Sequence, residues 1–195
     1  GSLWQPISLG VTVFGIGVIF GQLFNLPLDR YLPFLCIGMI QWQFLTNVFN
    51  DMSGVFANGS AHKDTRYDEL IIFPLRIWSK QIFQMCFNVI ILFVVALYFK
   101  LALSLVQLLI SITGLVIFSY ITLYCGLLFC LVGAFYKDFA NIVKNIFGLL
   151  FFVTPVMWQP SSLKYSYVFD FNPIYHLIEI VRRPILDYSN FEFAH

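Results

Sequence analysis

Charged residues are scarce in this chain of 195 residues, and their scarcity excludes most classes of protein. Only 11% of the residues are charged, 59% are hydrophobic, and the mean hydropathy is +0.83. Soluble domains carry about 25% charged residues, so this chain lacks the polar surface that a water-soluble domain needs. A disordered chain would be less hydrophobic. The net charge of +1 gives no sign of a nucleic-acid partner. The class that remains is a polytopic membrane protein.

Catalytic and metal-binding motifs are also missing from the sequence. It contains no G-x-x-x-x-G-K-[ST] phosphate loop, so it cannot hydrolyse ATP by that route. G-x-S-x-G and H-E-x-x-H are absent, and none of the four cysteines forms a C-x-x-C pair. We therefore expect no catalytic residue, metal site or cofactor in this chain.

Long runs without any charge are what the chain does contain. A bilayer core of about 30 Å is crossed by about 20 helical residues. The runs are continuously apolar and too long for the alternating strands of a β-barrel, so the expected fold class is all-α. Five transmembrane helices are predicted, at residues 3–24, 31–57, 76–98, 108–134 and 140–158.

Polar residues of the second predicted span share one helix face. Asn47, Asn50, Asp51, Gly54 and Asn58 follow the spacing i, i+3, i+4, i+7 and i+11. Such a face contacts protein or water rather than lipid. Two interpretations stay open: hydrogen bonding between helices, or the wall of a vestibule at the inner side.

The connection after this span, residues 59–69, is the most charged stretch of the chain. It is either a solvated loop or a docking element for a soluble partner. Lys and Arg are more frequent in the short connections on one side of the predicted membrane. Because such residues favour the cytoplasm, we expect the N-terminus and this loop to lie there.

A short amphipathic helix is predicted after the fifth span. Asn172 is a good N-cap and Pro173 a good first helical residue. An apolar stripe follows at i, i+3, i+4 and i+7, with Glu179, Arg182 and Arg183 lying off it and Glu179 paired to Arg183. Pro184 is expected to end the helix. About ten residues are too few to span the bilayer, so an interfacial or re-entrant helix is predicted.

Three segments of the chain carry distinct motifs: an aromatic-basic-Asp turn in 136–143, a Thr-Pro-hydrophobic-x-Trp span end in 151–158, and an Asn-Pro…Glu-x-x-Arg-x-Pro segment in 172–184. Together they resemble the ABC-2 type permeases of bacterial polysaccharide exporters. Within that group the chain most resembles O-antigen exporters, then capsule and teichoic-acid exporters. The opening Leu3-Trp4-x-Pro6 and the Gly38–Trp42 region also fit.

The resemblance implies a transport permease, not an enzyme. It would pair with a second copy of itself and with two ATP-binding subunits, which hold the ATP and Mg, and move a lipid-linked polysaccharide across the bacterial inner membrane. Family members also have an interface helix before the first span and a sixth span. Neither is found in 1–195, so we expect this single transmembrane domain to be truncated at both ends.

The resemblance also assigns roles to residues. Those expected to couple the permease to the ATPase are His62, Lys63, Asp64, Arg66, Tyr67, Tyr136, Lys137 and Asp138. The aromatic residues expected along the substrate pathway, on which sugar rings would stack, are Trp4, Trp42, Tyr120, Tyr124, Phe152 and Trp158. The residues expected in a periplasmic gate are Asn172, Pro173, His176, Glu179, Arg182 and Arg183.

Three alternatives remain at this point. An ABC-2 permease for a drug, a lipid or another glycan has the same sequence features. An ion-coupled secondary transporter needs buried ionisable residues, and the predicted spans contain almost none. A membrane-embedded polysaccharide polymerase needs clustered charges on the outer face, for which only Arg182 and Arg183 are candidates.

Overall fold

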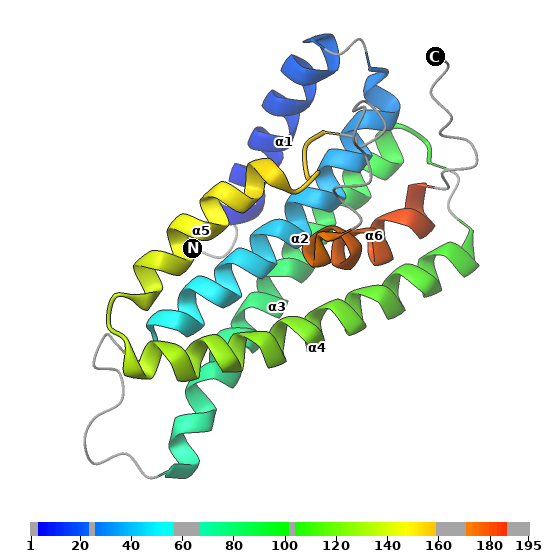
Figure 1. Cartoon of the computed structure of the whole chain (residues 1–195). Coiled ribbons are helices and arrows are strands. Elements are labelled where there is room, and N and C mark those ends of the chain that lie inside the picture. The colour runs from blue at the N-terminus through cyan, green and yellow to red at the C-terminus, as the bar shows by residue number, and fades with distance from the viewer. Residues whose placement is uncertain (1–3, 24–25, 57–66, 102–103, 159–170, 187–195) are drawn as a thin grey trace.

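The computed structural model describes residues 4–23, 26–56, 67–101, 104–158 and 171–186, without the side chains of 67–70 (Figure 1). Every regular element in these ranges is an α-helix, which confirms the all-α prediction. The helices are α1 (Trp4–Leu23), α2 (Leu28–Gly54), α3 (Tyr67–Tyr98), α4 (Leu105–Phe135), α5 (Phe139–Val153) and α6 (Pro173–Leu186).

Four of these helices, α1 to α4, are long and apolar enough to cross a membrane. The fifth predicted span, 140–158, is not confirmed, because α5 has only 15 residues. At 1.5 Å per residue it extends about 22 Å, short of the bilayer core. The helix stops because Thr154 precedes Pro155 and adopts an extended conformation, ψ 131°. A residue before proline is sterically disfavoured in the helical region.

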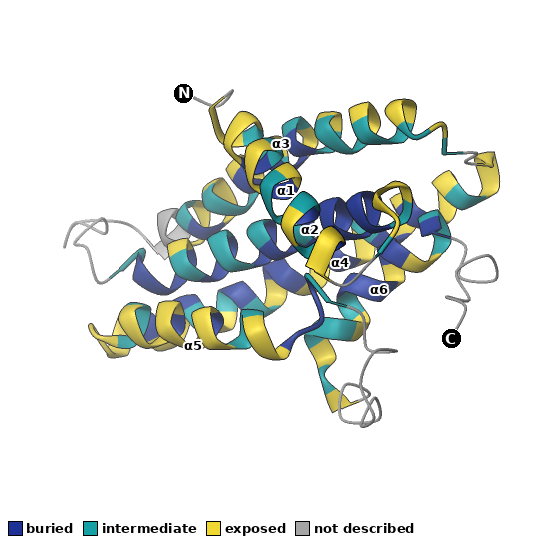
Figure 2. Ribbon diagram, turned by 90° about the horizontal axis from the view of Figure 1, so that it is seen from above, coloured by how far each residue is buried: buried dark blue, intermediate teal, exposed yellow. Residues whose placement is uncertain are grey.

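Helix α2 lies at the centre of the bundle and packs against every other described helix. In its most apolar window 78% of the residues are buried, against at most 33% in the other three long helices. Figure 2 shows the buried colour concentrated along α2, with exposed residues on the outer sides of the helices around it. The outward side chains of α1, α3 and α4 are largely apolar, as expected where helices face lipid.

The polar face of α2 is joined to α3 by a series of hydrogen bonds. Gln81 accepts a bond from the Asn47 amide at 3.4 Å and donates one to Asp51 at 3.0 Å. About two turns after Gln81 on α3, the Asn88 amide donates a hydrogen bond to the Gln43 side-chain oxygen at 3.0 Å. These contacts support the first interpretation of this stripe, hydrogen bonding between helices, for the part that the structure describes.

Glycines set the close approach of α4 to its neighbours. A Cβ atom on Gly114 would lie 3.0 Å from the Ile180 carbonyl of α6, and one on Gly126 or Gly133 would overlap Met52 or the Ser53 carbonyl of α2. Because Gly133 is near the end of α4 and Ser53 near the end of α2, the turn after α4 lies at the same end of the bundle as the end of α2.

Candidate functional site

The start of α6 is attached to the end of α5. The Asn172 side-chain oxygen accepts hydrogen bonds from the backbone N–H groups of Ile174 (3.0 Å) and Tyr175 (3.4 Å), which confirms the predicted N-cap. Its amide nitrogen donates to the buried hydroxyl of Thr154 at 3.0 Å. One side chain therefore caps α6 and fixes it to the bend that ends α5.

Replacing Asn172 by Ala is expected to destabilise the protein by about 1–2 kcal/mol, because both the cap and the partner of Thr154 are lost. Asn172→Asp is the matched variant, since Asp caps a helix equally well but donates nothing to Thr154. The loss of stability caused by Asn172→Asp should therefore be smaller than that caused by Asn172→Ala. Thermal unfolding of the purified protein in detergent measures the loss of stability in both variants, and an Asn172→Ala midpoint equal to wild type contradicts the capping role.

Among the described residues, Arg182 has the largest fully buried side chain. Its guanidinium donates to Glu179 Oε1 and to the Pro155 carbonyl oxygen, both at 3.2 Å, and lies 3.9 Å from the centre of the Phe34 ring. Gly38 of α2 packs directly against it, where a Cβ would collide with the guanidinium. Burying a charge is costly unless it is paired, and these contacts supply the pairing. Arg182 thus joins α6 to both α2 and the Thr154–Val156 bend.

Two expectations for α6 need correction. Glu179 and Arg182 were predicted to lie off the apolar stripe of an amphipathic helix, but their exposed fractions are only 4% and 0%. Helical spacing alone did not indicate this burial, because it depends on the contacts of Arg182 with Gly38 and Pro155, which come from distant parts of the chain. Pro184 does not end the helix, which continues to Leu186. A proline so near the end of a helix removes one hydrogen bond of the last turn only.

The predicted pair between Glu179 and Arg183 is present, with Arg183 Nε 3.2 Å from Glu179 Oε2. The Arg183 side chain is 64% exposed, so it covers the outer side of the buried Glu179–Arg182 ion pair. Burial raises the pKa of the neighbouring Tyr175, and the Glu179 carboxylate raises it further. Four of the residues expected in a gate, Asn172, Glu179, Arg182 and Arg183, are thus fixed by hydrogen bonds or ion pairs within α6 and to the end of α5. Their role in gating stays a prediction.

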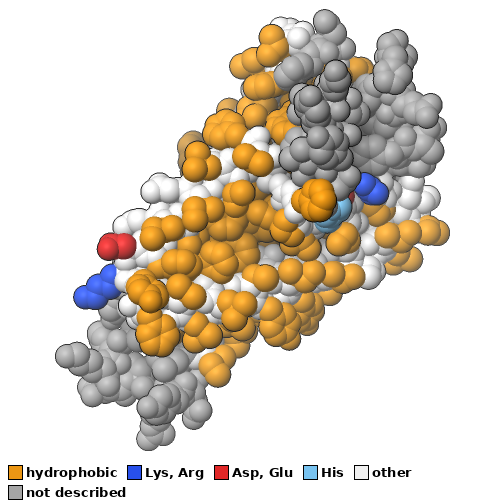
Figure 3. All heavy atoms as spheres, viewed as in Figure 1, with side chains coloured by type: hydrophobic (Ala, Val, Ile, Leu, Met, Phe, Trp, Pro, Cys, Tyr) orange, Lys and Arg blue, Asp and Glu red, His pale blue; other side chains and the backbone are white. Residues whose placement is uncertain are grey.

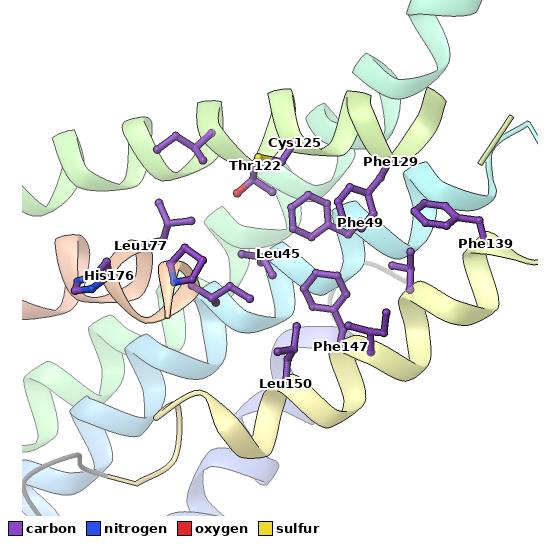
Figure 4. A pocket seen from close by; sticks show the side chains of 15 residues that line it. Leu45, Phe49, Thr122, Cys125, Phe129, Phe139, Phe147, Leu150, His176 and Leu177 are labelled. Atoms are coloured by element: carbon purple, nitrogen blue, oxygen red, sulfur yellow. The ribbon is translucent and has the colours of Figure 1, made fainter. Parts of the chain in front are cut away.

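An apolar groove of about 690 Å³ lies between α4 and α5, with α2 behind it and the first turn of α6 at one end (Figure 4). Phe49, Phe129 and Phe147 point into it, and Pro173 and His176 lie at its α6 end. Figure 3 shows a continuous hydrophobic surface over this side of the molecule. Thr122 and His176 are the polar side chains of the lining, so the groove suits hydrocarbon rather than the hydroxyl groups of a sugar.

The aromatic residues expected along a substrate pathway do not form a single wall in one copy of the chain. Trp42 is buried and packs on Phe147 and Phe151 with ring centroids 6.2 and 5.5 Å apart. Trp158 donates to the Phe152 carbonyl at 3.3 Å, which brings those two together. The others, exposed on α1 and α4, are Trp4, Tyr120 and Tyr124. Their role in transport stays a prediction.

Half of the residues expected to contact an ATPase are within the described ranges. Tyr136, Lys137 and Asp138 form the exposed turn between α4 and α5, and Tyr67 is the first residue of α3. The remaining four, which lie outside the described residues, are His62, Lys63, Asp64 and Arg66. The turn and the start of α3 are separated along the chain, and their contact with a partner stays a prediction.

The described helices have the architecture of a multi-pass membrane protein in which a short helix, α6, is attached to a central bundle. The family model described as ABC-2 type transporter matches residues 1–186, and the chain belongs to this family. Its members are transport permeases that generally work with ATP-binding subunits. No curated protein matches the chain significantly.

Proposed function

We propose that the chain is the transmembrane subunit of an ATP-driven exporter that moves a lipid-linked polysaccharide across the bacterial inner membrane. O-antigen is the favoured cargo, because the three motif segments most resemble O-antigen exporters. The permease acts as a homodimer with two ATP-binding subunits, and its N-terminus lies in the cytoplasm.

The observation that carries the proposal is the contact between two of the motif segments. Thr154 and Pro155 belong to the Thr-Pro…Trp segment, and Asn172 and Arg182 belong to the Asn-Pro…Arg segment. They meet through the Asn172–Thr154 and Arg182–Pro155 hydrogen bonds. Motifs that look independent in the sequence therefore build one structural unit, which supports their use as a signature of this group.

A mechanism follows from the helix arrangement. ATP binding closes the partner subunits, which push on the connection between α2 and α3 and on the exposed turn at Tyr136–Asp138. Because α2 packs against every other described helix, a push at its end moves the bundle as a rigid body. The two copies then separate enough for the glycan to pass between them.

Deleting the gene for the full-length permease tests the cargo. Long-chain glycan should disappear from the cell surface while lipid-linked glycan accumulates inside, because synthesis continues without export. Complementation with the wild-type gene is the control and should reverse both changes. A surface glycan of normal length and amount, with no lipid-linked glycan trapped inside, contradicts the proposed cargo.

A further inference from the structure

The apolar groove between α4 and α5 begins at an exposed turn and ends at the start of α6. Phe139, the first residue of α5, lines the groove next to the Tyr136–Asp138 turn, and His176 lies at the opposite end (Figure 4). The Thr122 hydroxyl donates to the Phe118 carbonyl at 2.8 Å, so this polar side chain is satisfied by its own helix. Between its two ends the groove therefore offers an occupant apolar contacts.

The groove has the length of an acyl chain in one leaflet of a bilayer. Its lining on α5 runs from Phe139 to Leu150, about 16 Å at 1.5 Å per residue. The hydrocarbon core of a bilayer is about 30 Å thick, so each leaflet contributes about 15 Å. A helix about 10 Å wide would need about 1,250 Å³ over this length, whereas the groove has about 690 Å³. These dimensions favour hydrocarbon chains over another helix.

The turn beside the groove has the side chains that a lipid headgroup would contact. Tyr136 is exposed, and tyrosine is enriched where a membrane protein crosses the membrane–water interface. Lys137 and Asp138 follow it and are also exposed. Within the described part of the chain neither charged side chain has a hydrogen-bond or ion-pair partner, and Asp138 precedes α5 without capping it. An ammonium group and a carboxylate are thus available beside the start of an apolar groove.

We propose that the groove binds a phospholipid whose headgroup carries both a phosphate and a primary ammonium group, which is phosphatidylethanolamine. One acyl chain lies along Phe139–Leu150, the phosphate pairs with Lys137, and the ammonium group pairs with Asp138. Opposite charges on adjacent residues match a zwitterionic headgroup, whereas a purely anionic headgroup would face the Asp138 carboxylate. The inference goes beyond the proposed function, because this lipid is a resident component of the permease and not its cargo.

The lipid that full-length permease retains through purification tests the groove. The protein is purified in a mild detergent, and native mass spectrometry counts the phospholipids bound to each chain. Leu150→Trp fills part of the groove and should lower the retained phosphatidylethanolamine about tenfold, as expected when about two methylene groups lose their burial. Leu149→Trp is the matched control, because Leu149 is exposed on α5 outside the lining, and it should retain as much lipid as wild type. Equal retention by the two variants contradicts binding in the groove.

Cys125 provides a second measurement in the unsubstituted protein. Its side chain lines the groove, whereas Cys86 is exposed on α3 and does not line it. After the lipid has been removed, added phosphatidylethanolamine should slow the modification of Cys125 by N-ethylmaleimide about tenfold, because a covered thiol is not accessible. Cys86 should react at an unchanged rate, and mass spectrometry of the peptides reports the two thiols separately. A Cys125 rate that the lipid leaves unchanged contradicts the proposal.

Competition between phosphatidylethanolamine and phosphatidylglycerol with identical acyl chains tests the headgroup. Wild type should prefer phosphatidylethanolamine about fivefold, as expected for one charge pair about 4 Å apart in water, and Asp138→Asn should abolish the preference. Lys137→Gln should weaken the binding of both lipids, because both carry the phosphate. Arg76→Gln, on the exposed side of α3, is the control and should change neither.

Two results overturn the choice of lipid. One is equal binding of the two phospholipids by wild type, and the other is retention of lipid-linked glycan in place of phospholipid. These measurements use neither ATP nor an ATP-binding subunit. A wrong cargo assignment therefore shows in the surface glycan of the deletion strain and leaves the binding of phosphatidylethanolamine unchanged.

Discussion

Replacing Arg182 by Ala is expected to cause one of the largest losses of stability of any single substitution in this protein, about 3–5 kcal/mol. The change removes the partner of the Pro155 carbonyl and of Glu179, whose exposed fraction is only 4%. It also empties the space between Phe34 and Gly38 that the guanidinium fills. The thermal unfolding midpoint of the purified permease, with hydrogen exchange of α6 to locate the loss, measures this effect.

Arg183→Ala is the matched control, because Arg183 contacts the same Glu179 carboxylate from one position further along the helix. Its side chain is 64% exposed, and exposed ion pairs contribute about 1 kcal/mol or less. Arg182→Lys keeps the charge but lacks the planar fork that reaches two acceptors, so it should fall between the two. Equal losses for Arg182→Ala and Arg183→Ala would show that burial of Arg182 contributes nothing.

Arg182 also shows where the sequence is a poor guide to the site. The N-cap Asn172 and the Glu179–Arg183 pair depend on residues within a few positions of one another, and the structure confirms both. The burial of Arg182 depends on Gly38 and Pro155, which only tertiary packing brings to it. A glycine with no local reason to be glycine, such as Gly38, was the available signal.

The spans were predicted from apolarity, which does not set where a helix ends. Helix α3 extends to Tyr67, beyond the predicted span at 76–98, because a helix can continue through residues that are too polar for the bilayer core. Helix α5 ends at Val153 although apolar residues continue, because Pro155 restricts Thr154. The sequence prediction also passed over Asn141, Lys144 and Asn145, which are exposed on α5, because the segment was judged by its hydrophobic residues.

The second large effect is expected at Gly133, where α4 and α2 are in backbone contact. A Cβ there would overlap the Ser53 carbonyl oxygen and lie 2.9 Å from its carbon, so the two helices must separate. We expect Gly133→Ala to destabilise the protein by about 1–3 kcal/mol and Gly133→Val by more, because a backbone atom cannot move aside as a side chain can. The thermal unfolding midpoint in detergent measures the series.

Gly15→Ala on α1 is the control, because a Cβ there meets nothing within 4 Å. A helical glycine in open space should gain about 0.5–1 kcal/mol on replacement by Ala, so the two substitutions are expected to have opposite signs. Gly133 lies close to the exposed turn at Tyr136–Asp138, so separating α4 from α2 would also displace this proposed contact with the ATPase. Gly133 variants should therefore lose ATP-driven export even at temperatures where they remain folded. A Gly133→Val permease with wild-type stability would mean that α2 and α4 are not in backbone contact at Ser53.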